Sequence, residues 1–197
     1  LIIFAFISNF GNRVTKSKFL NFLTTFSVCG YAIPGVILAV AYISFVSWFD
    51  NNFISFFEIK SIKSIFIGSI IGLVVVYFVR FYSLASNGIK SGYLKINYSI
   101  DESSYLLGYS KLKTFLNIHV PYLKNSVLLI GILIAIEIIK ELPITLILRP
   151  FNFETFATQA YIFASQDLLE AAAAPSLFLI IIASLFILTT YRYILKD

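Results

Sequence analysis

The sequence predicts an all-α integral membrane protein, a polytopic helical bundle, and three observations carry that prediction. Of the 197 residues, 59% are hydrophobic and 13% are charged, whereas soluble domains average about 45 to 50% apolar and about 25% charged residues. The mean hydropathy is +0.89. Beyond a short apolar stub at its start, the chain contains four long apolar stretches. These features exclude an ordinary soluble domain and a nucleic-acid-binding protein.

Each of the four apolar stretches is long enough to cross a bilayer, since about 20 helical residues span a ~30 Å hydrocarbon core. The stretches are 19–49, 65–85, 127–148 and 171–193. Pro34-Gly35 interrupts the first of them. We therefore expect Lys18 to Tyr31 to lie along the interface or to enter the membrane as a bent helix.

The positions of the cations predict the orientation. Of the 15 Lys and Arg residues, eleven fall on one side: Arg13, Lys16, Lys18, Arg80, Lys90, Lys95, Lys111, Lys113, Lys124, Arg192 and Lys196. The opposite loops contain only Lys60, Lys63 and Arg149. By the positive-inside rule the 87–122 loop and the C-terminus are cytoplasmic, and the segments 50–64 and 149–170 face outward.

The cytoplasmic loop 87–122 has the pattern of two short helices. Ser99 and Glu102 have the spacing of a capping box, which predicts a helix that ends at Gly108. A second helix is expected after Ser110 and should stop at Pro121. Its apolar face is predicted by spacing as Leu112, Phe115, Leu116 and His119. The two helices, joined at a glycine, would form a rigid elbow below the membrane.

The third apolar stretch contains ionisable residues within an otherwise aliphatic helix. Glu137, Lys140 and Glu141 have i, i+3, i+4 spacing and are expected on one face, toward a bundle interior or a water-filled path. Pro143 should displace the carbonyl of Ile139 from its helical bond. Three roles remain open: a self-neutralising pair that fixes helix register, a direct part in a cation conduit, and gating without substrate contact.

The elbow resembles the EAA loop of bacterial ABC-importer permeases, whose pattern is E-A-A, three residues, G, nine residues, I-x-L-P. This chain has Glu102-Ser103-Ser104, Gly108 and Ile118-His119-Val120-Pro121 at those positions. Serines replace both alanines and valine replaces leucine, so small and aliphatic residues are kept. In that family the elbow is the coupling helix that docks on the ATPase subunit. As an alternative for Glu102, the capping-box role alone explains the residue.

A second segment resembles ferric-iron importer permeases. Residues 140–155 read KELPITLILRPFNFET, close to the family's K-E-L-P-x-T-L-x-L-R-P-F-N-F-x-T segment. The segment Gly30-Tyr31-Ala32-Ile33-Pro34-Gly35 and the pair Arg80-Phe81 also match that subgroup. Permeases of this kind often carry two homologous halves in one chain. Because this sequence has one EAA loop, we expect residues 1–197 to be a single permease domain, a piece of a longer protein, most similar to the C-terminal half.

The resemblance implies the type I ABC importer (MetI-like) permease fold in a bacterial inner membrane, with import of ferric iron by alternating access. The implied partners are an ABC ATPase subunit, a periplasmic or extracellular substrate-binding protein, and an N-terminal half or second permease subunit. The coupling residues would be Glu102, Ser103, Ser104, Gly108, Leu112, Phe115, Leu116 and Pro121. The translocation path or gate would involve Glu137, Lys140, Glu141, Pro143 and Arg149.

The chain itself is expected to be neither an enzyme nor a cofactor-binding protein. It contains no G-x-x-x-x-G-K-[ST] motif, so ATP and Mg²⁺ would bind to the partner subunit. One cysteine, Cys29, and one histidine, His119, have no metal-ligand spacing, and we expect His119 to be solvated or packed in the loop. Related permeases move thiamine, phosphonates, polyamines or oxyanions. Two alternatives of other classes are a membrane-embedded hydrolase using Glu137 and Glu141, and a passive channel.

An amphipathic helix is predicted outside the membrane, after the third stretch. Its apolar residues recur at helical spacing: Phe153, Phe156, Ala157, Ala160, Tyr161 and Ala164. In the resemblance it lies where a substrate-binding protein would dock. The alternative is a helix that rests on the bilayer surface or covers the bundle.

Overall fold

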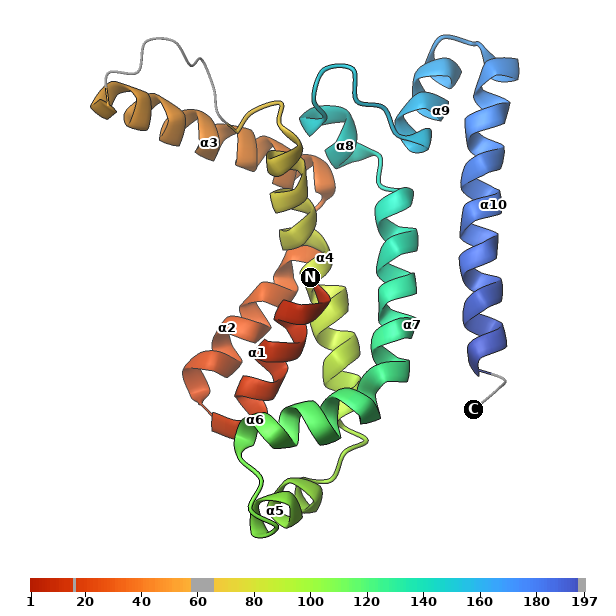
Figure 1. Ribbon diagram of the computed structural model, residues 1–197. Coiled ribbons are helices and arrows are strands. Elements are labelled where there is room, and N and C mark those ends of the chain that lie inside the picture. Colours follow the sequence, from red (N-terminus) through yellow and green to blue (C-terminus); the bar gives the residue numbers. More distant parts are fainter. Residues whose placement is uncertain (16, 58–65, 195–197) are drawn as a thin grey trace. The chain divides into compact units, whose positions relative to one another are not determined.

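The computed structural model describes residues 1–15, 17–57 and 66–194, and over these residues the chain is helical without any strand (Figure 1). Lys16, Lys60, Lys63 and Lys196, four of the cations used for the predicted orientation, lie outside the described residues. The helices are α1 (Ile2–Thr15), α2 (Lys18–Val28), α3 (Gly35–Phe57), α4 (Ile70–Tyr93), α5 (Tyr98–Leu106), α6 (Lys111–Thr114), α7 (Val120–Ile139), α8 (Pro143–Leu148), α9 (Phe156–Ser165) and α10 (Leu169–Ile194). A 3₁₀ turn, Cys29–Tyr31, follows α2, and a π-helical turn, Phe115–His119, joins α6 to α7.

Three helices among the described residues are long and apolar enough to cross a membrane: Ile70–Tyr93, Lys111–Ile139 and Leu169–Arg192. A fourth span is counted if Lys18–Tyr31 and Gly35–Asn52, which are bent by 112° at their junction, form one broken span. The prediction of an all-α membrane protein with a bent first span is therefore supported. The bend falls at Pro34-Gly35, where proline removes a backbone donor and disfavours helical geometry in the residue before it.

The third predicted stretch, 127–148, is not one helix. α7 ends at Ile139, and Pro143 is the first residue of the separate helix α8. Proline is well suited to that position, because the first helical N–H has no partner within the helix. The expectation that Pro143 sits inside a continuous span is therefore wrong: the chain breaks instead of kinking.

The structure divides into two compact units, which we describe separately. Unit 1 contains residues 1–32 and 81–134, and unit 2 contains 33–80 and 135–197. In unit 1, Gly88 and Gly92 of α4 let α7 approach, because a Cβ atom at these positions would lie 2.5 Å from Ile130 and 2.9 Å from Leu123. Small residues at a helix interface allow this close packing in membrane bundles.

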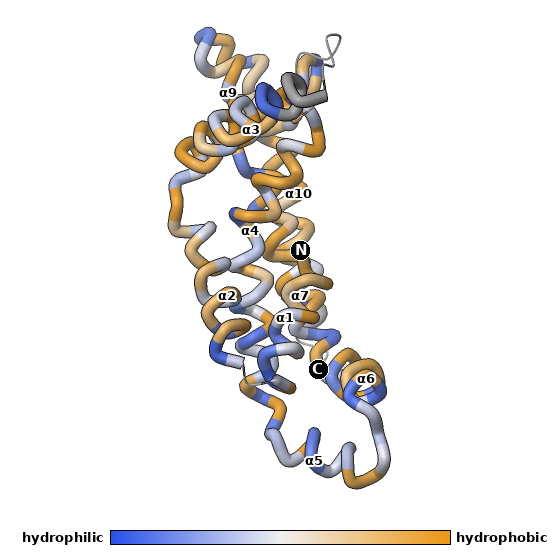
Figure 2. The backbone as a smooth tube through the Cα atoms, turned by 90° about the vertical axis from the view of Figure 1, so that its left-hand side faces the viewer, coloured by the Kyte–Doolittle hydropathy of each residue, from blue (hydrophilic) through white to orange (hydrophobic). Residues whose placement is uncertain are grey.

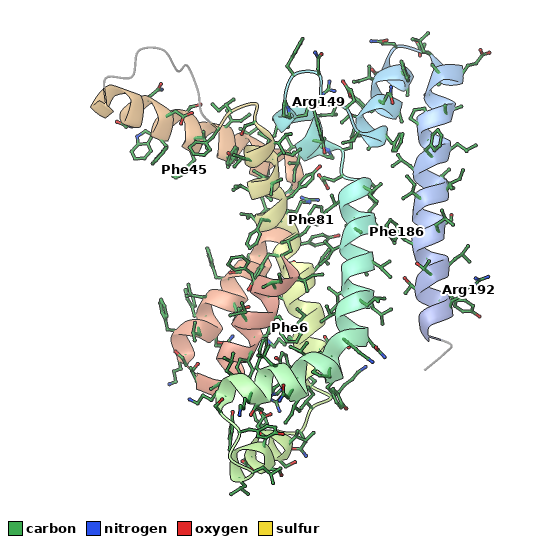
Figure 3. All side chains as sticks on the ribbon, viewed as in Figure 1. Phe6, Phe45, Phe81, Arg149, Phe186 and Arg192 are labelled. Atoms are coloured by element: carbon green, nitrogen blue, oxygen red, sulfur yellow. The ribbon has the colours of Figure 1, made fainter. Side chains whose placement is uncertain are left out.

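Unit 2 is built around an apolar cluster contributed by α3, α4 and α8. The buried members are Ala39, Leu73, Val76, Ile144 and Leu148. α9 packs along α10, where the rings of Phe156 and Phe178 stack at 5.4 Å. Several large apolar side chains of α3 face outward, among them Phe45, labelled in Figure 3. In a lipid environment such exposure has no hydrophobic cost.

Candidate functional site

The elbow predicted for the 87–122 loop is present as α5, Gly108 and α6. Gly108 has φ = +83°, a left-handed conformation that only glycine adopts without steric cost. The N–H of Gly108 donates to the carbonyl of Tyr105 and that of Tyr109 to the carbonyl of Ser104, the pattern of a Schellman motif. The prediction that Gly108 ends the first helix is confirmed.

The start of α5 differs from the predicted capping box. Asn97, rather than Ser99, is the N-cap, and its side chain accepts from the N–H of Ser99 at 3.3 Å. Glu102 is exposed to solvent. Because asparagine is as good an N-cap as serine, the helix begins two residues earlier than predicted, and the Glu102 carboxylate lies outside any capping box.

Ser104, which stands at the second alanine of the EAA pattern, connects the two arms of the elbow. Its hydroxyl lies 2.8 Å from the hydroxyl of Thr114 on α6, and both side chains are buried. A hydroxyl at this buried position therefore has a matching partner across the turn. Ser103 is exposed and donates to the carbonyl of Ser99.

The second arm of the elbow does not stop at Pro121. α6, the π turn and α7 form one continuous helical segment, Lys111–Ile139, and Pro121 lies in the first turn of α7. The N–H of Val120 bonds to the carbonyl of Phe115, five residues back. Such π turns are rare and occur mostly as single turns inside α-helices. Figure 1 shows the ribbon bending between α6 and α7.

The π turn also changes which residues face inward. Thr114 and His119, five positions apart, are both fully buried, although an α-helix would rotate them onto different faces. Leu112 and Leu116 of the predicted apolar face are 65% and 52% exposed. Phe115 faces inward, with its ring 5.1 Å from Phe6 and 4.6 Å from Phe10. The predicted face is thus split in two.

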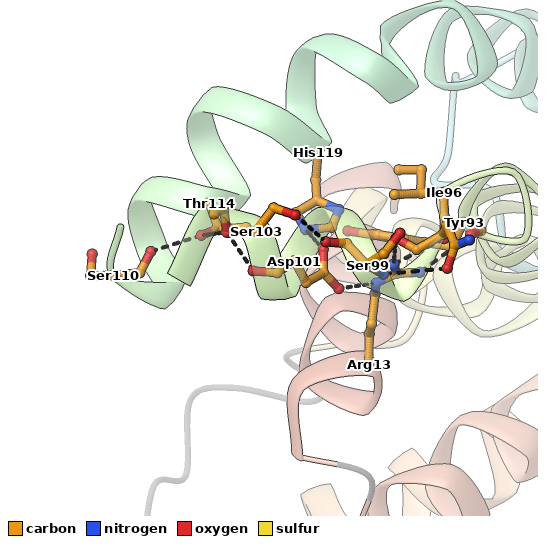
Figure 4. A network of polar contacts seen from close by, with 11 residues as sticks. Arg13, Tyr93, Ile96, Ser99, Asp101, Ser103, Ser110, Thr114 and His119 are labelled. Atoms are coloured by element: carbon orange, nitrogen blue, oxygen red, sulfur yellow. Dashed lines mark hydrogen bonds and ion pairs between the residues drawn. The ribbon is translucent and has the colours of Figure 1, made fainter. Parts of the chain in front are cut away.

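A buried polar cluster, which we call the clamp, holds the elbow in unit 1 (Figure 4). It consists of Arg13, Asp101 and His119. Arg13 Nε lies 2.6 Å from Asp101 Oδ2, and His119 Nε2 lies 3.0 Å from Asp101 Oδ1. Since one carboxylate faces a cation and an imidazole at once, α1, α5 and the π turn are joined at one point.

The other Arg13 donors bind the end of α4. Its two Nη atoms donate to the carbonyls of Tyr93, Ile96 and Asn97 at 2.9 to 3.3 Å. Its guanidinium also lies 4.3 Å from the centre of the Tyr98 ring, within the range of a cation–π contact. Arg13 therefore binds the last residue of α4 and the segment that leads into α5, where the carbonyls of Tyr93 and Asn97 also accept from the N–H groups of Ile96 and Ile100.

Sequence reasoning missed the clamp. In the sequence analysis Arg13 served only to predict the orientation, and Asp101 was only a residue between Ser99 and Glu102 of the predicted capping box. His119 was expected to be solvated or packed, and the structure has it packed. Arg13 and Asp101 are 88 residues apart, so no local spacing connects them. The available signal was a carboxylate and a lone histidine on adjoining helices of the loop.

Unit 2 has its own buried ion pair at the break between α7 and α8. Arg80 Nε lies 3.4 Å from Glu141 Oε2, and Arg80 Nη1 donates to the carbonyl of Ile33 at 3.0 Å. Glu141 Oε1 accepts from the N–H of Ile144 at 3.4 Å. A Cβ atom on Gly35 would lie 3.0 Å from that carboxylate oxygen. Three segments quoted for the family resemblance thus meet at one place.

The predicted charged face of residues 137, 140 and 141 is not formed. Lys140 pairs with Glu137 at 2.7 Å, and its side chain is 60% exposed. Glu141 instead faces Arg80, because α7 ends at Ile139 and the chain turns away from the helical path. The Glu137–Lys140 pairing agrees with the self-neutralising alternative for those two residues.

Arg149 lies at the C-terminal end of α8, labelled in Figure 3, and pairs with Glu154. Arg149 Nη1 also donates to the carbonyl of Phe153 at 3.2 Å, and Thr158 donates to Glu154 Oε2 at 2.9 Å. The hydrogen bond from Arg149, with a smaller contribution from Thr158, lowers the pKa of Glu154 below its ordinary value.

A helix is present where the amphipathic helix was predicted: it is α9, which begins at Phe156 rather than Phe153. Thr155 caps it, with a reciprocal bond between Thr155 and Thr158. Among the described residues, no group of three or more His, Cys, Asp or Glu side chains could hold a metal ion. No model of a known protein family, no curated protein and no solved structure matches the chain.

Proposed function

We propose that this protein is a permease subunit of an ATP-driven, binding-protein-dependent importer, with the elbow as the contact for a separate ATPase subunit. The observation that supports this most is the elbow itself. It consists of two short helices joined by a glycine in the left-handed conformation. The clamp connects it to the rest of unit 1, and its second arm continues into an apolar helical segment long enough to span a membrane.

The outer surface of the elbow suits a protein partner. The tube of α5 is mainly pale and hydrophilic in Figure 2, yet Leu106, Leu107, Leu112 and Leu116 are all exposed there. Glu102 is exposed beside them. Apolar side chains on an otherwise polar projection are typical of a docking surface.

The connections of the elbow would transmit force. One arm continues through the π turn into α7, and the clamp joins the other arm to α1 and the end of α4. A rigid displacement of the elbow would therefore move three helices of unit 1 together. Such rigid-body rocking is how packed helices produce alternating access.

Ferric iron is the solute we propose, on the resemblance of residues 140–155 to iron importers. Arg80, Glu141 and Gly35 come from three of the matching segments and meet in unit 2, which supports a shared architecture at that place. Glu137, Lys140, Pro143 and Arg149 are proposed for the path or gate. The α9 helix is proposed to bind the substrate-binding protein. An importer of another small solute is the second candidate.

Site-directed crosslinking tests the proposed ATPase contact and the predicted orientation. Cys29 is the single cysteine, so Cys29→Ser gives a clean background for Ser103→Cys. We expect a crosslink to the ATPase subunit from Ser103→Cys and none from the matched exposed position Ser165→Cys on α9. Failure to capture the ATPase from position 103, or labelling of that position from outside intact cells, would refute the proposal.

Uptake measurements test coupling and solute. Gly108→Pro should abolish uptake, because proline cannot take a positive φ, while subunit assembly persists. Glu137→Gln should reduce uptake of radiolabelled ferric iron in cells with the complete system. If iron uptake is absent but another solute is taken up through the same subunits, the importer proposal stands and the iron assignment is wrong.

A further inference from the structure

Unit 1 contains a polar cavity that neither the elbow nor the clamp accounts for. It has a volume of about 750 Å³ and lies between α1, α2 and the end of α4. The side chains that give it its polar character include Asn12, Asn21, Thr25, Asn87, Lys90 and Lys95. A space of this size is in the range of small-molecule sites.

The charge of the cavity favours an anion. Lys90 and Lys95 both line it, and within the described part of the chain neither forms an ion pair. Arg13 also reaches the cavity, but its charge is balanced by Asp101. None of the described lining residues is acidic. Both lysines are exposed residues, so they place two uncompensated ammonium groups at the solvent side of the cavity, where they attract negative charge.

The helix α2 links this cavity to the lipid phase. Asn21, Thr24, Thr25 and Val28 have i, i+3, i+4, i+7 spacing and line the cavity. Phe19, Phe22, Leu23 and Phe26 repeat the same spacing and are all exposed. One face of the helix thus suits a polar headgroup, and another suits acyl chains.

We propose that this cavity binds the headgroup of an anionic phospholipid, such as phosphatidylglycerol. The phosphate faces Lys90 and Lys95. Because Arg13 and Tyr93 belong to both the cavity wall and the clamp surroundings, a bound headgroup also contacts the support of the elbow. This inference does not depend on the transported solute or on the ATPase.

Native mass spectrometry of the purified, delipidated full chain tests the proposal, with defined lipids added back. We expect phosphatidylglycerol to bind at least about tenfold more tightly than phosphatidylcholine, since each lysine near anionic lipid contributes about fivefold.

Variants assign the binding to the cavity. Lys90→Gln and Lys95→Gln should each weaken phosphatidylglycerol binding about fivefold, while the matched control Arg192→Gln, an exposed cation outside the cavity, should leave it unchanged. Glycerol 3-phosphate that displaces the lipid at equal concentration would keep the phosphate chemistry but assign the site to a soluble ligand. Equal binding of phosphatidylglycerol and phosphatidylcholine, or equal effects of Lys90→Gln and Arg192→Gln, would overturn the proposal.

Discussion

The two units each bury an arginine beside a carboxylate, and the surroundings of the two pairs differ. In unit 1 the Arg13–Asp101 contact is 2.6 Å, and the arginine also donates to three carbonyls between the end of α4 and the start of α5. In unit 2 the Arg80–Glu141 contact is 3.4 Å and lies against Gly35, where an added Cβ atom would be crowded by both side chains. The pair in unit 1 depends on the hydrogen bonds of Arg13. The pair in unit 2 depends also on the absence of a side chain at position 35.

The glycines of the two units show the same contrast. Gly108 has a positive φ and nothing within 4 Å of an added Cβ, so its conformation is what restricts it. Gly35 has no positive φ, but three atoms lie within 3.1 Å of its added Cβ. A residue type alone therefore does not say which physical constraint acts on it. Substitutions that separate the two constraints test this difference.

The largest expected effect is the loss of the clamp. Arg13→Gln leaves the Asp101 carboxylate buried without its cation, which should lower the free energy of unfolding by about 3 to 5 kcal/mol. Arg149→Gln removes a partly exposed pair in unit 2 and should cost only about 0 to 1 kcal/mol. Equilibrium unfolding in detergent micelles measures both. Equal losses would show that the hydrogen bonds of Arg13 add nothing beyond a surface pair.

Gly35→Ala tests the space beside the second pair. The added methyl group would press on the Glu141 carboxylate, the Arg80 guanidinium and Ile144, and overpacking of this kind costs about 1 to 3 kcal/mol. The matched control is Gly11→Ala in α1, where nothing lies within 4 Å and alanine should stabilise the helix by about 0.5 to 1 kcal/mol. Stabilisation by both substitutions would contradict the crowding at Gly35.

Gly108→Ala tests conformation without crowding. Alanine at a left-handed position should cost about 1 to 2 kcal/mol, whereas Gly108→Asn should cost less, because asparagine tolerates this conformation. Asparagine at Gly35 should instead be worse than alanine, since it is larger. Thermal unfolding of the four variants gives the two orders, and the same order at both positions would remove the distinction.

The smallest effect is expected at Glu154. Because Arg149 lowers the pKa of this carboxyl in the folded protein, its contribution to stability is present above the ordinary carboxyl value near 4.5 and is lost as the pH falls through the lowered pKa. The difference in Tm between the natural chain and Glu154→Gln should therefore shrink from pH 7 toward pH 3. The side chain is 42% exposed, so solvent screens the effect.

Composition and local spacing predicted the parts of this fold that depend on neighbouring residues. The apolar spans, the bend at Pro34-Gly35, the glycine turn at 108 and the capped helix α9 all follow from residues within a few positions of one another. Membrane spans are also the most reliable pattern, since a helix must satisfy its own backbone in lipid.

The parts that sequence reasoning missed depend on distant partners. Arg13 finds Asp101 across 88 positions, and Arg80 draws Glu141 out of the expected charged face. The break after Ile139 was missed because Pro143 was placed inside a helix, although proline is equally suited to the first position of one. In each case local spacing allowed more than one arrangement, and a contact between residues far apart in the sequence determined which one the protein adopts.

The π turn at Phe115–His119 also affects how cysteine-accessibility data for this helical segment are plotted on a helical wheel. One extra residue in a helix rotates every following side chain by about 100° around the helix axis. A single helical-wheel diagram for residues 111–139 would consequently assign the wrong side to every position after the turn. Cysteine-accessibility scans of this segment need two helical-wheel diagrams. One ends before Phe115 and is oriented by the buried Thr114; the other starts at Val120 and is oriented by the buried His119, which directly precedes it.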